Sequence, residues 1–256
     1  MKFYTDVHRY MNQLYYRGRT DNGSAIINNV TFKPTLYSSS TKPVTSAFSS
    51  MDGRPVVPRT FGRMSEAKQW VEENEQITGR SIYGTVNYKH QWITQKYPGD
   101  IEFDINHINI VNLDIEVHSD EGFPTPEEAK WPVTAITLKS SQSEVYHTFG
   151  LSKWDETKRD PSINHLLVQY RECATEEELL RKFITHWRSN WPDIVTGWNV
   201  RAFDMLYLAN RIRNLSGTSE TLKGLSPYNL EGEIKRSQGS AGASGEPAPI
   251  LGYDIP

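Results

Sequence analysis

The chain has 256 residues, a formal net charge of −3 and a hydrophobic content of 37%. These values are typical of a soluble globular protein with one large domain or two modest ones. No apolar run of about 18 residues occurs and the N-terminus lacks a secretory signal, so we expect a cytoplasmic protein without membrane contacts. The single cysteine, Cys173, excludes an internal disulfide and a cysteine-based metal site.

Residues 1–107 are predicted to form a small α+β domain. The alternation of apolar and polar residues over 2–37 indicates strands. Helical spacing of apolar residues follows Ser65, which we expect to be the N-cap of a helix over 66–77. Further strands are expected between this helix and the end of the domain.

The pattern changes at Ile108, where a second domain, 108–256, is predicted to begin. Residues 108–117 form the β-branched run INIVNLDIEV, which is typical of a central strand buried on both faces. The elements expected after it are strands over 133–140, 144–150 and 165–171, a helix over 176–190 capped by Thr175 and Glu178, a strand over 193–199, and a helix over 203–215 ended by Gly217. This order predicts an α/β domain.

The last part of the sequence is predicted to be irregular. Ser237–Pro249 is a low-complexity run that is compatible with a hairpin tip, a linker or a cloning scar. The flanking segments, 231–236 and 249–255, are able to pair as two strands. The sequence stops at Pro256, inside the second of them, so we expect the domain to be incomplete at its C-terminus.

Two carboxylates lie two residues apart in the predicted central strand. Because side chains alternate along a strand, Asp114 and Glu116 share one face, with attachment points about 6–7 Å apart. Two acidic groups at this short separation repel each other and are costly to desolvate. A hard divalent cation bound between them offsets both costs. The same short pattern is also typical of a solvated strand end, so it does not identify a metal site by itself.

A third carboxylate, Asp204, is expected in the first turn of the helix over 203–215. The positive end of the helix dipole favours its ionised form there. An ordinary N-terminal helix carboxylate would look the same. With Asp114 and Glu116, however, Asp204 would supply a two-metal site, in which ions about 3.5–4 Å apart generate hydroxide and stabilise the leaving oxygen.

The two carboxylate motifs together resemble those of a known family. VNLDIEV with its following Gly-Phe-Pro loop, and TGWNVRAFD with its following helix, are similar to the first two exonuclease motifs of family B DNA polymerases, in particular the T-even-type phage replicative polymerases. The resemblance covers essentially the whole chain and is strongest over 108–230. It implies a mixed-sheet, RNase H-like domain of the DEDD exonuclease class, preceded by a small N-terminal domain.

The resemblance also implies a role for each matching residue. Asp114 would bridge two metal ions, Mg²⁺ or Mn²⁺, Glu116 would bind the ion that activates water, and Asp204 would serve the second ion. Asn199 would contact the terminal nucleotide. Phe123 would wedge against unpaired bases, although a loop phenylalanine that packs locally is an equal alternative.

One motif of the family is missing from the chain. In the family, a tyrosine followed a few residues later by an aspartate supplies the fourth carboxylate, and Tyr253-Asp254 does not have this spacing. Residues 233–255 instead resemble the family's β-hairpin that helps to part primer from template. The polymerase motifs are absent as well. We therefore expect a second, C-terminal chain to carry the third exonuclease motif and the polymerase.

The resulting hypothesis is 3′→5′ proofreading excision on single-stranded or primer–template DNA by a phage protein in its host cell. Family N-terminal domains of this type bind nucleic acid, so RNA binding by residues 1–107 is a second expected role. The alternative is a non-catalytic fragment that binds nucleic acid or acts as a scaffold. Metal-dependent excision that is lost on Asp114→Ala distinguishes the enzyme from the binding module.

Overall fold

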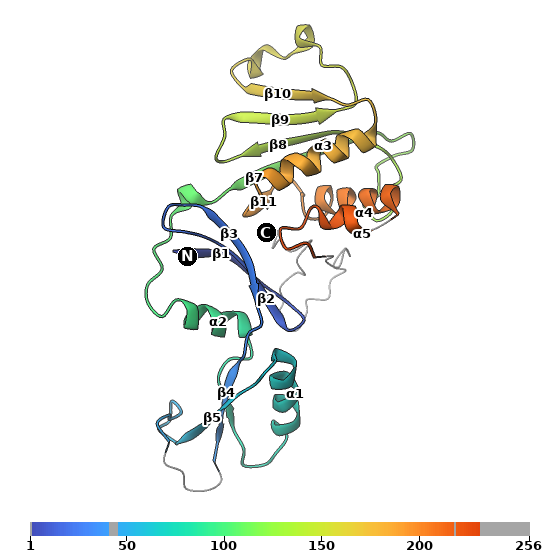
Figure 1. Ribbon diagram of the computed structural model, residues 1–256. Coiled ribbons are helices and arrows are strands. Elements are labelled where there is room, and N and C mark those ends of the chain that lie inside the picture. Colours follow the sequence, from blue (N-terminus) through green and yellow to red (C-terminus); the bar gives the residue numbers. More distant parts are fainter. Residues whose placement is uncertain (1, 41–45, 218, 231–256) are drawn as a thin grey trace. The chain divides into compact units, whose positions relative to one another are not determined.

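The computed structural model describes residues 2–40, 46–217 and 219–230 (Figure 1). The chain divides into two compact units, residues 1–103 and 104–256. Each unit has a hydrophobic core of its own.

The first unit contains two three-stranded sheets. In one sheet, the antiparallel strands in order are β1 (Phe3–Tyr10), β2 (Gln13–Arg19) and β3 (Ala25–Val30). In the other, the central strand β4 (Thr35–Ser39) pairs antiparallel with β5 (Val56–Thr60) and β6 (Ile82–Tyr83). The strands predicted over residues 2–37 from the alternation are confirmed by β1 to β4.

Helix α1 (Met64–Asn74) differs from its prediction at both ends. Ser65 is not the N-cap, because Met64 is fully buried as the first helical residue and Arg63 takes the cap position. The side chain of Glu66 accepts the Arg63 amide at 3.2 Å, which closes this helix end. At the other end, Ile77 is 46% exposed and lies outside the helix, so it does not extend the buried face.

Helix α2 (Tyr88–Lys96) stands where only strands were expected. Asn87 caps it by accepting the His90 amide at 3.3 Å. Its buried residues are Tyr88 and Trp92, one turn apart. So narrow an apolar stripe produces a weak periodic signal, which is why the sequence pattern did not indicate a helix.

The second unit is built on a five-stranded mixed sheet with the order β10-β9-β8-β7-β11. Its strands are β7 (Ile110–Val117), β8 (Val133–Ser140), β9 (Val145–Gly150), β10 (Leu167–Glu172) and β11 (Ile194–Thr196). β7 and β9 flank β8 and run antiparallel to it. β10 pairs parallel with β9, and β11 pairs parallel with β7. The expected α/β architecture with a mixed sheet is confirmed.

β7 lies inside the sheet, as expected, but only one of its faces is buried. Val111, Leu113 and Ile115 are buried, and the residues between them are exposed. The prediction of a strand buried on both faces is therefore wrong. The polar residues that alternate with this apolar set, Asp114 and Glu116 among them, are the physical reason.

Two helices pack on this sheet in Figure 1. α3 (Glu176–Ser189) contacts β8 and β9, and α4 (Asp204–Ser216) contacts β7. The predicted cap of α3 is confirmed, because the Thr175 side chain accepts the Glu178 amide at 3.2 Å. Gly217 ends α4 in the left-handed conformation, with φ of 61°, where a side chain would be strained.

The remaining described helices are short. They are α5 (Ser219–Lys223) and the 3₁₀ turns η1 (Ile105–His107), η2 (Glu156–Lys158) and η3 (Pro161–Ile163). Within the described ranges, every helix is too short or too polar to cross a membrane. The predicted hairpin, 233–255, lies outside the described residues, as does the low-complexity run within it.

Candidate functional site

The exposed face of β7 carries two of the three carboxylates. Asp114 and Glu116 are both exposed, and the buried Ile115 separates them, as the alternation of the strand requires. Asp114 lies opposite Thr137 of β8. The Thr137 hydroxyl hydrogen-bonds the hydroxyl of Thr148 on β9 at 3.1 Å, so the sheet surface beside Asp114 is polar.

The third carboxylate follows β11, the strand next to β7. β11 pairs with β7 up to Thr196, opposite Asn112, and then stops. The next residue, Gly197, passes so close to β7 that a Cβ atom there would lie 2.4 Å from the Leu113 carbonyl oxygen. Only glycine allows this approach, which brings the loop leading to α4 against the strand that carries Asp114.

Asp204, the first residue of α4, lies at the edge of β7 beyond the end of β11. Its Oδ1 accepts a hydrogen bond from the Ile115 amide at 3.1 Å. Ile115 is the residue between Asp114 and Glu116, so the three acidic residues meet on one short stretch of the strand. Asp204 is only 4% exposed, and a buried carboxylate needs a donor of this kind.

A buried polar pair attaches the start of β11 to β7. Asp193 Oδ2 accepts the Asn109 amide at 2.9 Å, and the Asp193 amide donates to the Asn109 carbonyl at 2.8 Å. The Asn109 side chain accepts from the Ser140 hydroxyl at 2.6 Å and donates to the Asn190 carbonyl at 3.2 Å. These bonds hold β11 in register with β7, and so they hold the loop that leads to Asp204.

Asp204 lies in an environment that disfavours its charge. Burial is the main cause that raises its pKa to about 6. The negative charges of Asp114 and Glu116 act in the same direction, whereas the hydrogen bond from the Ile115 amide opposes the rise. The site therefore concentrates negative charge around a desolvated carboxylate.

Carboxylate oxygens are the ligands that Mg²⁺ and Mn²⁺ prefer in proteins, so the donor chemistry of the site fits a hard divalent cation. Across the residues that the structure describes, however, no group of three or more His, Cys, Asp or Glu side chains is arranged to hold a metal ion. Oδ1 of Asp204 is directed at the backbone of β7, while Asp114 and Glu116 lie on the exposed face. The metal-ligand roles of these residues stay a prediction.

The loop between β11 and α4 holds Asn199 and an aromatic residue that the sequence pattern did not single out. Asn199 is exposed and has a φ of 57°, a left-handed conformation that asparagine tolerates. Trp198, its neighbour, is 94% exposed. A tryptophan is usually buried for most of its surface, so this exposure marks Trp198 as a candidate stacking residue. Its place in the same motif as Asn199 was the available signal.

Phe123 is 81% exposed in the loop after β7. Its ring nevertheless contacts Phe203, with the ring centroids 5.2 Å apart, and Phe203 contacts Tyr207 at 5.5 Å. Phe203 directly precedes Asp204, so the structure brings Phe123 to the N-terminal end of α4. One side of the Phe123 ring is packed locally, and most of its surface is open to a ligand.

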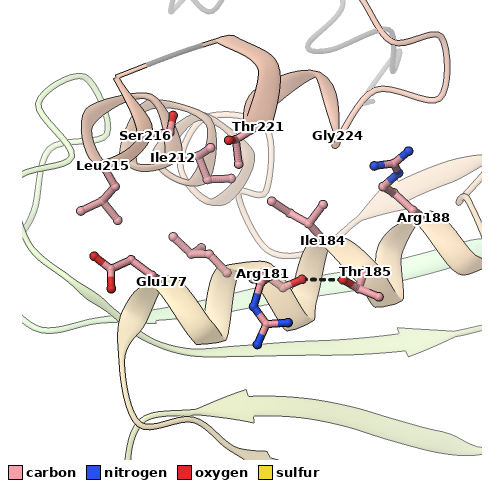
Figure 2. Close-up of a pocket in the computed structure, with 11 residues that line it drawn as sticks. Glu177, Arg181, Ile184, Thr185, Arg188, Ile212, Leu215, Ser216, Thr221 and Gly224 are labelled. Carbon is pink, nitrogen blue, oxygen red and sulfur yellow. Dashed lines mark hydrogen bonds between the residues drawn. The ribbon is translucent and has the colours of Figure 1, made fainter.

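A separate cavity of about 430 Å³ lies between α3, α4 and α5. In Figure 2, Ile184 of α3 and Ile212 of α4 point towards the space between their helices, and Arg181 and Arg188 are among the lining residues. None of the three carboxylates lines this cavity. It is therefore distinct from the candidate site.

Comparisons with known proteins agree with the resemblance. A family model described as "DNA polymerase family B, exonuclease domain" matches residues 60–245. The chain is 31% identical over 245 residues to the DNA-directed DNA polymerase of Escherichia phage RB69, a match that covers 89% of this chain and 27% of that protein.

Two further relatives extend this comparison. The chain is 28% identical over 244 residues to the DNA-directed DNA polymerase of Enterobacteria phage T4, covering 88% of this chain and 27% of that protein. A stretch of 108 residues is 45% identical to the DNA polymerase catalytic subunit of Elephantid herpesvirus 1, covering 40% of this chain and 10% of that protein. The chain thus spans about a quarter of the length of the phage relatives.

Proposed function

The chain belongs to the exonuclease domain family of family B DNA polymerases, and from this membership we propose that it carries a 3′→5′ proofreading site, which hydrolyses the last phosphodiester of a DNA strand. The phage relatives are DNA-directed DNA polymerases, which supports DNA as the substrate. The observation that carries the proposal is the hydrogen bond from the Ile115 amide to Asp204. This bond connects Asp204, from the second carboxylate motif, to β7 between Asp114 and Glu116, which form the first motif.

The proposal includes an RNase H-like arrangement of the second unit. Two features support it: a mixed five-stranded sheet with β7 inside, and acidic residues at the point where β11 ends beside β7. Loops at such strand ends are common places for active sites, because the sheet fixes the side chains that flank them.

Asp114, Glu116 and Asp204 would hold divalent cations, Mg²⁺ or Mn²⁺, that supply an activated water and stabilise the leaving 3′ oxygen. The chain's own contribution is to hold these acidic groups in place. Asp114 and Glu116 are fixed by the pairing of β7 with β8, and Asp204 by its hydrogen bond to Ile115. Their repulsion in the absence of a cation is the reason to expect cation binding.

The strand end would be held by the residues around the carboxylates. The exposed rings of Phe123 and Trp198 suit stacking against unpaired bases, which is largely independent of sequence. Asn199, exposed in the loop next to Trp198, offers an amide that both donates and accepts hydrogen bonds to a terminal nucleotide. Together they would favour a single-stranded 3′ end over a paired one.

The site would also need residues from outside this sequence. The family resemblance implies a fourth carboxylate, and we propose that a C-terminal segment or chain supplies it together with the polymerase. The chain itself spans 27% of each phage relative. Excision that appears only when this part is added would support a divided site. Binding of a single strand without cleavage under either condition would favour a non-catalytic binding module.

The direct test is excision of a 3′-labelled single-stranded oligonucleotide in Mg²⁺ or Mn²⁺, with the C-terminal part added. We expect Asp114→Ala to abolish excision while the strand still binds. Glu172→Ala, which removes an exposed acidic side chain at the end of β10 in the same sheet, is the matched control and should leave excision unchanged. Excision that survives Asp114→Ala would disprove the proposed site.

A further inference from the structure

One face of α4 is bonded to the loop that follows β7. Tyr207, Asn210, Arg211 and Asn214 occupy positions i, i+3, i+4 and i+7, so they lie on one side of the helix. All four bond to the backbone of residues 126–131.

Each contact is a hydrogen bond of ordinary length. The Tyr207 hydroxyl accepts the Trp131 amide at 3.1 Å and donates to the Trp131 carbonyl at 2.7 Å. The Asn210 amide group donates to the carbonyl of Pro126 at 2.9 Å. The Asn214 amide group donates to the carbonyl of Glu128 at 2.8 Å. Within this part of the loop the Ala129 amide donates to the Thr125 carbonyl at 3.0 Å, and several other carbonyls are bonded by side chains of α4.

Arg211 connects this loop to a second helix. Its Nη1 donates to the Lys130 carbonyl at 2.7 Å, and its Nε and Nη2 bond both oxygens of Glu176 at 2.9 and 2.7 Å. Glu176 begins α3 and also accepts the Val133 amide at 2.7 Å. A two-pronged pair of this kind, with both side chains mostly buried, is geometrically specific. It fixes the loop at the point where β8 begins.

The backbone conformation of Ala129 is unfavourable, so the surrounding contacts must hold the loop in it. It is fully buried, and its φ of 42° is in the left-handed region that a residue with a Cβ atom rarely adopts. Its carbonyl accepts from Arg211 at 3.2 Å and from Asn214 at 3.4 Å. Strain of this kind persists only where surrounding contacts enforce it, and it is often found at functional loops.

The same loop carries Phe123, and the residue that Phe123 touches, Phe203, is the N-cap of the same helix. The ring of Phe123 rests on Phe203 at the start of α4, and Phe203 rests on Tyr207. From these contacts we propose that the loop-facing side of α4 positions Phe123 at a constant distance from Asp204. This role rests on the proposed function: α4 would couple the place where an unpaired strand end is held to the place where it is cut.

The first arm of the test needs no DNA. Hydrogen–deuterium exchange is measured on the chain, on Asn210→Ala/Asn214→Ala and on Tyr207→Phe. We expect the amides of residues 119–131 to exchange faster in both variants, and the Trp131 amide above all in Tyr207→Phe, while β8 and β9 keep their protection. Thr185→Ala on α3, whose hydroxyl donates to the Arg181 carbonyl of its own helix at 2.8 Å, is the control. Unchanged exchange in residues 119–131 would overturn the proposal.

The second arm measures binding of an oligonucleotide with 2-aminopurine at its 3′ end, in buffer free of divalent ions so that nothing is cut. We expect Phe123→Ala and Asn210→Ala/Asn214→Ala each to weaken binding of an unpaired end by about tenfold, the order of one lost base stack. The triple variant should bind no more weakly than either. Binding of a fully paired end should not change.

The outcomes separate the two hypotheses. If the losses from Phe123→Ala and from the asparagine pair multiply in the triple variant, α4 does not act through Phe123 and the positioning role is wrong. If the unaltered chain does not distinguish unpaired from paired ends, the proposed function itself fails, and the positioning role fails with it. The positioning role is tested by comparing the variants with one another, and the proposed function is tested on the unaltered chain alone.

Discussion

Asp204 is a carboxylate with only 4% of its surface exposed, and the cost of burying its charge is offset in part by backbone amides, its own and that of Ile115. Two further carboxylates, Asp114 and Glu116, lie near enough to raise its pKa. A residue placed for stability would avoid such an arrangement. The conflict between stability and charge at this position therefore points to function.

Asp204→Asn separates these two effects. Asparagine keeps an oxygen that accepts the Ile115 amide and removes the charge, so we expect the free energy of unfolding at pH 7 to rise by about 1–2 kcal/mol. Metal-dependent excision should be lost. Asp204→Ala, which leaves the Ile115 amide without an acceptor, should instead destabilise the fold. Denaturant melts compare the three proteins, and an asparagine variant less stable than the unaltered chain would contradict the argument.

A pair of histidines predicts how stability depends on pH. His147 and His186 have ring centroids 4.3 Å apart, and burial, the neighbouring ring and Arg171 lower the pKa of His186 to about 4. Burial lowers the pKa of His147 as well. Because the folded protein favours the neutral rings, their contribution is present above about pH 6.5 and is lost as the pH falls towards 4.

We expect the histidine pair to lower the free energy of unfolding by about 1 kcal/mol between pH 7 and pH 5, a value reduced for solvent screening because His186 is only half-buried. Protonation of Asp204, whose pKa is raised to about 6, acts in the opposite direction over the same range, so the histidine contribution is the difference between the unaltered chain and His186→Gln. Thermal melts over this range measure it. His186→Gln should become more stable relative to the unaltered chain as the pH falls from 7 to 5, and His90→Gln, at an exposed position on α2, should not. An equal pH dependence in His186→Gln and in the unaltered chain would contradict the role of the histidine pair.

The sequence indicated Asp114, Glu116, Asp204, Asn199 and Phe123, because residue types and spacing are visible in one dimension. It did not indicate the exposure of Trp198, since solvent accessibility depends on packing between distant segments. The hydrogen bond between Asp204 and the Ile115 amide could not be predicted from the sequence either. It spans 89 residues and depends on the exact place where β11 stops.

At the scale of elements, Asn109 adds to the pairing of β11 with β7, because its side chain bonds the segment that leads into β11. Its side chain is 1% exposed and bonds to Ser140 and to the Asn190 carbonyl. We expect Asn109→Ala to lower the free energy of unfolding by about 1–3 kcal/mol, because the part-buried groups of Ser140, Asn190 and Trp191 lose the partner that its side chain provides. Denaturant titration measures it, with the exposed Asn164→Ala as the control, for which a change of under about 0.5 kcal/mol is expected. Equal effects would refute the special role of Asn109.

Elements with a strong local signal were predicted and weaker ones were not. The cap of α3 by Thr175 and the end of α4 at Gly217 follow from local chemistry, and both are confirmed. The start of α1 was misplaced because the burial of Met64, a tertiary effect, moved the cap from Ser65 to Arg63. Polar residues alternate along β7 in the sequence, but the density of β-branched residues favoured the wrong prediction that both faces of the strand are buried.

At the scale of the whole molecule, the two cores share no residue, so damage to one should remain local. Phe183 is fully buried in the core of the second unit. We expect Phe183→Ala to cost that unit about 3–5 kcal/mol and to raise hydrogen exchange in β7, β8 and β9. Exchange in β1 and β2 should stay as it is. Faster exchange in both units would show that they unfold together.

β11 has three residues, and its shortness has a consequence for how this domain could change. Had the strand run a few residues further along β7, its own backbone would have met the Ile115 amide. Asp204 could then not have accepted the Ile115 amide at the edge of the sheet. Mutations that lengthen regular structure, a common route to greater rigidity, would here compete directly with the acidic centre. We therefore expect substitutions that extend β11 past Thr196 to reduce activity at the acidic centre, even where they raise the free energy of unfolding.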